Sequence, residues 1–273
     1  MVDLPAAYAS CARLARAHYE NFPVASLLMP RRMRDDVAAI YAFARVADDF
    51  ADEGDLPPDI RLRLLGGWQS RLHAAVAGEA EQPPAMAGEP ADTAAMFQAL
   101  ANTIRVRDLP PELFDDLLSA FRQDVTVTCY GSWDALLDYC RRSANPIGRL
   151  VLRVAGYRDA RLDGWSDAIC SALQLTNFWQ DQAVDAQRGR SYVPADAPGR
   201  SRAEVMHGLL QRTRRLFDDG RPLCDAVRGR LRYELRATWL GGVRILDRLD
   251  AGADRPRLGL ADVPPIALQM VTW

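Results

Sequence analysis

The stretch YAFARVADDFADE, residues 41–53, and the stretch LQLTNFWQDQAVD, residues 173–185, each place two aspartates four positions apart. Because an α-helix turns by about 100° per residue, side chains at this spacing share one face. The first stretch therefore carries a polar stripe about 60° wide and the second a stripe about 80° wide. The stripes consist of Tyr41, Arg45, Asp48 and Asp52 in the first stretch and of Gln174, Asn177, Asp181 and Asp185 in the second.

Apolar residues surround the second stripe, which indicates a largely buried helix whose polar side chains face an internal cavity. These residues are Leu173, Leu175, Phe178, Trp179 and Val184. A buried ionised carboxylate is costly without a counter-charge, and Arg45 alone cannot neutralise four of them. Divalent cations and protonation are the remaining options, and ligand sets of carboxylate and amide oxygens favour hard ions such as Mg²⁺.

Length and composition limit the class of protein. With 273 residues, 49% hydrophobic and 26% charged, the chain is long enough for one large core. We predict a single domain over residues 1–273. The formal net charge of -2 argues against a nucleic-acid-binding protein that depends on net charge. All 34 basic residues are arginine, which excludes Schiff-base chemistry on a lysine.

Cysteine usage and hydropathy indicate the compartment. Five cysteines without CxxC spacing favour a reduced, cytoplasmic chain. The first residues lack the apolar core of a signal peptide, and no run of about 18 apolar residues could cross a bilayer. We therefore expect a cytoplasmic protein, for which a peripheral contact with the inner face of the membrane stays open.

The spacing of apolar residues is helical almost throughout, so the sequence predicts an all-α fold. The expected helices cover residues 5–20, 31–53, 58–77, 92–106, 110–128, 132–156, 163–187, 202–218 and 221–250. Pro146 should kink or break the sixth of them, because proline lacks a backbone donor and clashes with the preceding turn. Ser201 and Glu204 have the spacing of a capping box, and the tail from residue 255 allows at best a short helix.

The two aspartate pairs suggest metal-assisted chemistry on a diphosphate. Carboxylates repel a diphosphate, but bridging Mg²⁺ ions reverse the sign of that interaction. Such a cluster would draw charge from the leaving group and promote loss of diphosphate, which leaves a carbocation. Arg45, Arg188 and Arg190 could donate charge-assisted hydrogen bonds to the phosphates. The carbocation needs an apolar, aromatic chamber, whose candidate residues are Tyr41, Phe43, Tyr139, Phe178, Trp179 and Tyr192.

Each of these features also has an ordinary interpretation. The segment DDFADE alone is typical of a solvated acidic helix end, and Arg188 and Arg190 are equally typical of surface arginines. Tyr139 alone is typical of a packed aromatic residue. The repetition of the D-xxx-D stripe in two separate helices favours the functional interpretation.

At these residues the chain resembles the squalene and phytoene synthases, which join prenyl diphosphates head to head, and within them the bacterial hydroxysqualene synthases of hopanoid pathways. The resemblance extends from about His18 to the tail. Its most specific segments are FPVASLLMPRRMRDDVAAIYAFARVADDFADEGD, FRQDVTVTCYGSWDALLDYCRRSANPIGRLVL and LQLTNFWQDQAVDAQRGRSYVP.

The resemblance implies an isoprenoid synthase bundle around a central apolar cavity. It implies Mg²⁺ ligands at Asp48, Asp52, Asn177, Asp181 and Asp185. Tyr139 matches a tyrosine implicated in catalysis, so the predicted catalytic residues are the four aspartates, Arg45 and Tyr139. With the residue-level arguments above, the predicted substrate-binding residues are Tyr41, Arg45, Gln174, Asn177, Phe178, Gln180, Arg188, Arg190 and Tyr192.

The resemblance also implies a reaction. In this subgroup Mg²⁺-assisted loss of diphosphate from presqualene diphosphate gives a cyclopropylcarbinyl cation, which rearranges and is quenched by water to hydroxysqualene. Water takes the place of hydride, so no nicotinamide is needed. The expected partner is a lipophilic prenyl diphosphate, with no nucleic acid. Contacts with the pathway enzymes upstream and downstream stay open.

Two departures from the family pattern bear on the choice of reaction. Gln180 stands where condensing relatives usually carry arginine, and Tyr19, Glu20 and Asn21 replace a stretch rich in serine and lysine. Loss of two cationic positions favours a substrate with one diphosphate. The alternatives are a condensing synthase that makes presqualene diphosphate, squalene or phytoene, and a non-catalytic assembly or binding protein with the same fold. The latter would be expected to lose its aspartates, and this chain keeps all four.

Overall fold

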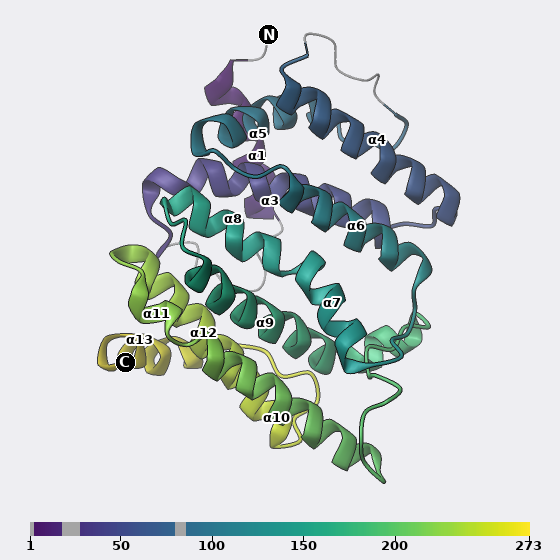
Figure 1. Cartoon of the computed structure of the whole chain (residues 1–273), viewed down its shortest axis with the longest axis vertical. Helices are drawn as coiled ribbons and strands as arrows, with labels where there is room; N and C mark the ends of the chain where they lie inside the picture. Colours follow the sequence, from purple (N-terminus) through teal and green to yellow (C-terminus); the bar gives the residue numbers. More distant parts are fainter. Residues whose placement is uncertain (1–2, 18–27, 80–85) are drawn as a thin grey trace. The chain divides into compact units, whose positions relative to one another are not determined.

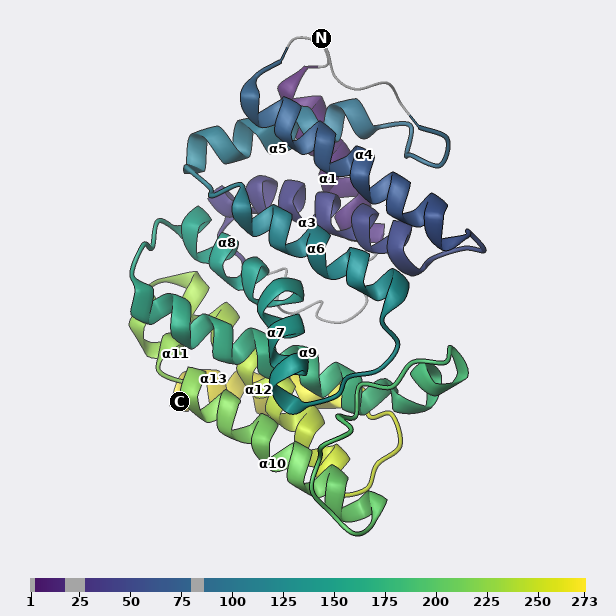
Figure 2. The same ribbon diagram turned by 45° about the vertical axis from the view of Figure 1, so that its right-hand side comes forward.

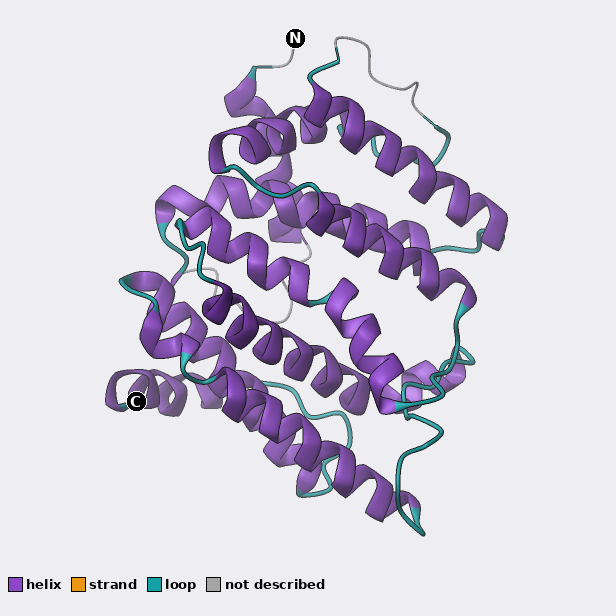
Figure 3. Cartoon of the chain, viewed as in Figure 1, coloured by secondary structure: helices purple, strands orange, loops and turns teal. Residues whose placement is uncertain are grey.

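A computed structural model describes residues 3–17, 28–79 and 86–273, and every regular element in these ranges is a helix (Figures 1 and 3). Contacts between Cα atoms divide the chain into two compact units. The first contains the N-terminal helix with residues 31–127 and 149–157, and the second contains residues 128–148 and 158–273. The predicted all-α fold is confirmed, whereas the single domain over residues 1–273 stays a prediction.

Five helices make up most of the first unit. They are α1 (Leu4–Ala17), α3 (Arg31–Asp52), α4 (Pro58–Ala77), α5 (Thr93–Arg107) and α6 (Glu112–Thr126). Helix α3 contacts the other four. Its Phe43 ring is fully buried, stacked on Trp68 at 6.0 Å and edge-on to Phe114 at 5.4 Å. Phe43 is therefore part of this core, and its proposed place in the wall of a reaction chamber was wrong.

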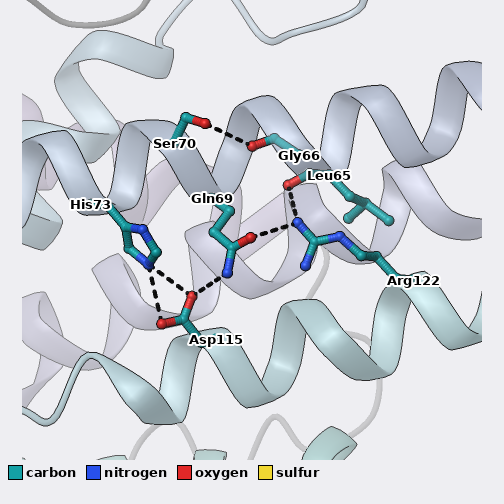
Figure 4. Close-up of polar contacts among 7 residues, drawn as sticks. All are labelled: Leu65, Gly66, Gln69, Ser70, His73, Asp115 and Arg122. Carbon is teal, nitrogen blue, oxygen red and sulfur yellow. Dashed lines mark hydrogen bonds and ion pairs between the residues drawn. The ribbon is translucent and has the colours of Figure 1, made fainter.

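A polar network joins α4 to α6 (Figure 4). The Gln69 amide nitrogen donates to the Asp115 carboxylate at 2.6 Å, and the Arg122 guanidinium donates to the Gln69 amide oxygen at 2.8 Å. Nε2 of His73 also lies 2.9 Å from the Asp115 carboxylate. Because Gln69 uses both ends of its amide, α6 is held in one register along α4. This fixes the last turn of α6, which carries Asp124.

The second unit is built around one long helix, α9 (Ala160–Gln187), which contacts α7, α10, α11 and α12. Helices α10 and α12 contact each other and lie side by side in Figures 1 and 2. The remaining elements of this unit are α7 (Trp133–Ser143), α10 (Arg202–Gly220), α11 (Leu223–Ala226), α12 (Arg230–Asp250), the 3₁₀ turn η1 (Leu260–Asp262) and α13 (Val263–Thr272).

Glycine and a buried hydrogen bond set the spacing of these helices. A Cβ atom at Gly242 of α12 would lie 2.5 Å from the Phe217 ring and 2.7 Å from Leu173, so the backbones approach closely only because the side chain is absent. The indole nitrogen of Trp179 donates to the Thr213 hydroxyl at 2.9 Å in the interior. Trp179 therefore joins α9 to α10, and its place in the chamber wall stays a prediction.

Helix boundaries follow the sequence signals with two differences. The expected helix 132–156 is divided into α7 and α8 (Asn145–Ala155), as Pro146 predicted, and the proline occupies the first turn of α8, where no backbone donor is needed. The expected helix 221–250 was wrong, because Gly229 has φ 66° and separates α11 from α12. Ser201 caps α10 by accepting from the Glu204 amide at 3.2 Å.

The tail forms α13, a short helix as expected. Among the described residues, no helix is both long enough and apolar enough to cross a membrane.

Candidate active site

The first aspartate motif lies on α3 of the first unit. Tyr41, Arg45, Asp48 and Asp52 are all half-buried, and the helix runs without interruption from Arg31 to Asp52, so the four share the predicted face. Phe43 lies about 200° around the helix from Tyr41, which explains why it points into the core instead.

Arg45 is shared among acidic side chains of the same segment. Its guanidinium lies 2.6 Å from the Asp49 carboxylate, 3.6 Å from Asp48 and 3.5 Å from Glu53. The sequence analysis assigned Arg45 to phosphates, whereas in the structure its shortest ion pair is with Asp49. One cation thus serves three carboxylates, which leaves negative charge at the motif.

The pKa of Asp48 reports this excess of negative charge. Although 43% of its side chain reaches solvent, protein surrounds its carboxyl on most sides, and burial is the first cause that raises its pKa to about 7. The like charges of Asp52, Asp124 and Asp49 raise it further, and Arg45 opposes them. Asp124 of α6 was missed by the sequence analysis, although it lies in the second segment that carries the family resemblance.

The second motif lies on α9 of the second unit. Gln174, Asp181 and Asp185 are half-buried, and Asn177 is exposed. Burial raises the pKa of Asp185, the charge of Asp181 raises it further, and nearby arginines lower it. The two units therefore share one pattern. In each motif a carboxyl has a raised pKa, and the causes are burial and its partner aspartate four positions away. That the two motifs face each other stays a prediction.

Arg255 was also missed by the sequence analysis. Its Nε lies 2.6 Å from an oxygen of Asp181, and its backbone φ of 43° is unusual for a residue with a side chain. Next to it, the Gln180 amide donates to the Pro256 carbonyl at 2.5 Å, so the loop after α12 is bound to α9 at two adjacent positions. No pattern in the sequence connects residues so far apart in the chain.

Two pockets adjoin α9, and each is lined by one of the aspartates predicted to bind metal and by at least one arginine. The first, of about 460 Å³, is lined by residues that include Asn177, Gln180, Asp181, Arg255, Arg257 and Leu258. The second, of about 320 Å³, is lined by residues that include Phe178, Gln182, Asp185, Arg190, Tyr192 and Met206. Asp181 and Asp185 thus open into different pockets. Carboxylate and guanidinium side by side suit a metal ion and the phosphate that it accompanies.

Four aromatic rings gather beside the second pocket. Phe178 and Tyr192 are stacked with centroids 3.7 Å apart, and Tyr139 lies 6.0 Å from Phe178 and 5.6 Å from Tyr130. Tyr139 is buried. The structure therefore brings together three of the predicted residues, Tyr139, Phe178 and Tyr192, and adds Tyr130 to them.

The loop after α9 returns to the segment before α7, and this return places Tyr192. The amide of Ser191 donates to the Thr128 carbonyl at 2.7 Å, and the amide of Ala195 donates to the Tyr130 carbonyl at 3.0 Å. Arg190, one residue earlier, lines the second pocket, whereas Arg188 is exposed at the end of α9.

Protein ligands alone do not form a metal cage here. Among the described residues, no group of three or more His, Cys, Asp or Glu side chains is arranged to hold a metal ion. Mg²⁺ is usually bound by one or two carboxylates together with water and substrate phosphates, so paired aspartates fit an ion whose remaining ligands are water or phosphate oxygens. The departure from the family at Tyr19, Glu20 and Asn21 lies outside the described residues.

The fold is shared with solved prenyl synthases. The squalene synthase HpnC from Alicyclobacillus acidocaldarius matches with a TM-score of 0.81 at 36% identity, over 92% of this chain and 96% of that one. A dehydrosqualene synthase matches with a TM-score of 0.82 at 18% identity, over 98% of this chain and 96% of that one. The fold is thus that of the all-α isoprenoid synthases.

Sequence comparison narrows this class to a family. The family model of squalene/phytoene synthase matches residues 15–264, and the chain belongs to that family. A hydroxysqualene synthase from Rhodopseudomonas palustris is 37% identical over 225 residues, which are 77% of this chain and 72% of that protein. A phytoene synthase from Mycobacterium tuberculosis is 29% identical over 257 residues, which are 92% of this chain and 76% of that protein. The resemblance is confirmed, and the chain is an isoprenoid synthase.

Proposed function

We propose that this protein is a hydroxysqualene synthase, which converts presqualene diphosphate and water to hydroxysqualene and diphosphate with the help of Mg²⁺. The observation that carries the proposal is the pattern repeated on α3 and α9. In each motif, burial and the charge of the aspartate four positions away raise the pKa of one aspartate. Such an environment is relieved when a divalent cation neutralises part of the negative charge at the motif.

The residues assigned to the metal are Asp48 and Asp52 on α3, and Asn177, Asp181 and Asp185 on α9. When bound, Mg²⁺ supplies Lewis-acid assistance to the departing diphosphate. The protein contributes cations for the phosphate oxygens, and Arg190 is the best placed of those predicted, because it lines a pocket with Asp185. Arg188 is exposed and does not line that pocket, so the structure supports Arg190 rather than Arg188 as a phosphate ligand.

The aromatic group explains how a carbocation would survive. The faces of Tyr139, Phe178 and Tyr192 attract a cation through their quadrupoles, and their packing excludes water from most of the surface that they cover. A reaction that ends in capture of the cation by water requires that water reaches only one position. A close-packed aromatic wall would keep water off the side of the cation that it covers.

Two observations favour this reaction over condensation of two prenyl diphosphates. Gln180 offers a neutral amide where condensing relatives usually carry arginine, and that amide is occupied by the Pro256 carbonyl. Relatives that carry the name hydroxysqualene synthase reach 36–40% identity, against 28–32% for phytoene synthases that match. We place the enzyme in the cytoplasm, with a lipophilic prenyl diphosphate as substrate and the neighbouring pathway enzymes as candidate partners.

The test is product analysis with purified protein and Mg²⁺. Presqualene diphosphate should yield hydroxysqualene, and farnesyl diphosphate alone should not be consumed. Asp52→Asn and Asp181→Asn should abolish turnover with the helical circular dichroism retained. Asp35→Asn, which removes an exposed aspartate from the same α3 helix, should leave turnover unchanged. Consumption of farnesyl diphosphate alone would identify a condensing synthase instead.

A further inference from the structure

Exposed apolar side chains concentrate at one end of the described chain. Eight large hydrophobic residues are exposed among the described residues, and four of them lie between residues 260 and 271. They are Leu260 at 91% exposure, Val263 at 37%, Leu268 at 65% and Val271 at 74%. Isolated exposed apolar residues are normal on a protein surface, but a cluster of four within twelve residues indicates an interaction surface.

Helix α13 is apolar on both of its faces. Its inner face packs Ile266 and Met270 on Ala237 of α12, with Leu28, Leu240 and Leu258 around them. Its outer face carries Leu268 and Val271, and residues 263–273 contain no ionisable side chain. A helix on the surface of a water-soluble body normally presents polar residues outward. The outer face of α13 is therefore suited to an apolar surrounding.

Positive charge and an aromatic ring border this face. Beside α13, Arg236 pairs with Asp225 at 2.7 Å and Arg221 adds a second guanidinium, so two cations accompany one carboxylate there. The guanidinium groups of Arg221 and Arg236 lie 4.5 Å and 5.1 Å from the ring centroid of Trp273. An apolar helix face bordered by tryptophan and arginine is the signature of a helix that lies in a membrane interface.

We propose that α13 docks this protein on the surface of an anionic lipid bilayer. Leu260, Leu268 and Val271 enter the boundary of the acyl chains, and Trp273 with Arg221 lies at the level of the headgroups. Ten residues span about 15 Å as a helix, half the thickness of the hydrocarbon core, so α13 lies along the surface instead of crossing it. The exposed guanidinium of Arg221 complements anionic lipid headgroups. This docking goes beyond the proposed reaction and does not depend on it.

Co-sedimentation of the full chain with vesicles tests the proposal. Wild-type protein should bind mixed phosphatidylcholine and phosphatidylglycerol vesicles and bind pure phosphatidylcholine vesicles more weakly, and added salt should weaken binding to the mixed vesicles. The double substitution L268Q/V271Q should lower the partition coefficient at least about tenfold, because it removes two apolar side chains from the docking face. Val106→Gln, which changes a residue of α5 that is 55% exposed, is the matched control and should bind as wild type does.

Three results would overturn the proposal. The first is no binding to either vesicle, and the second is equal binding by wild type and L268Q/V271Q. The third is a wild-type dimer in sedimentation velocity that L268Q/V271Q converts to monomer, since α13 would then cover a second copy of the chain. Circular dichroism and thermal unfolding should show that both variants are folded. Because the assay measures binding without turnover, its failure is distinguishable from failure of the proposed reaction.

Discussion

Mg²⁺ should bind the first aspartate motif about tenfold more tightly at pH 8 than at pH 6. A protonated carboxyl cannot coordinate a metal ion, so binding must displace the Asp48 proton. With its pKa raised to about 7, the fraction of Asp48 that is ionised rises from about one tenth at pH 6 to about nine tenths at pH 8. The apparent affinity follows that fraction.

Titration calorimetry of the metal-free protein with Mg²⁺ at pH 6, 7 and 8 measures this dependence. Substrate is left out, because a diphosphate titrates in the same range. Repeating the pH 7 titration in buffers of different ionisation enthalpy counts the protons released, and about half a proton from Asp48 is expected there. Asp124→Asn removes a like charge that raises the pKa of Asp48, so the dependence should move to lower pH. Asp35→Asn should not move it.

Stability should change with pH in the opposite direction to metal affinity. The folded state raises the pKa of Asp48 above its ordinary value of 3.8, so it binds this proton more tightly than the unfolded chain does. The metal-free protein therefore loses stability as pH rises from about 4 to about 7. Asp48→Asn should remove this part of the dependence in thermal unfolding. Equal Mg²⁺ affinity at pH 6 and pH 8 would refute the electrostatic argument for the motif.

Three other outcomes are expected. Trp179→Phe should lower the free energy of unfolding by about 1–3 kcal/mol in urea titrations, because it leaves the buried Thr213 hydroxyl without the indole donor. Gly242→Ala should cost about 1–3 kcal/mol by overcrowding against the Phe217 ring, and a thermal midpoint equal to that of wild type would contradict the close approach. EDTA should stop turnover of presqualene diphosphate, and Mg²⁺ in excess over the chelator, but not Na⁺ at the same ionic strength, should restore it.

Local sequence signals predicted the helices and the polar stripes, because both depend on the periodicity of a single element. The interval 58–77 agrees with α4 at both ends, and Pro146 marked the division between α7 and α8. The same periodicity could have excluded Phe43 from the chamber wall, since its side chain points away from Tyr41. Gly229 was overlooked as a helix boundary, and in the structure it is the N-cap residue of α12, with φ 66°.

Contacts between distant segments could not be predicted in this way. Asp124 acts on Asp48 only because α6 packs against α3, and Arg255 reaches Asp181 across 74 positions of the chain. Such pairs depend on how helices pack, and a single sequence does not encode the packing in any local pattern. Tyr139, Phe178 and Tyr192 were selected as aromatic residues, but their stacking depends on the loop that returns to Tyr130.

The absence of a side chain at Gly242 has a consequence for the size of the pocket that contains Asp181. Gly242 and Leu173 both line the pocket that contains Asp181, and a methyl group at position 242 would press on Leu173. A larger residue there would narrow the space beside the carboxylate without touching any predicted metal ligand. The free space beside Asp181 therefore depends on a position in the middle of α12 that carries no side chain.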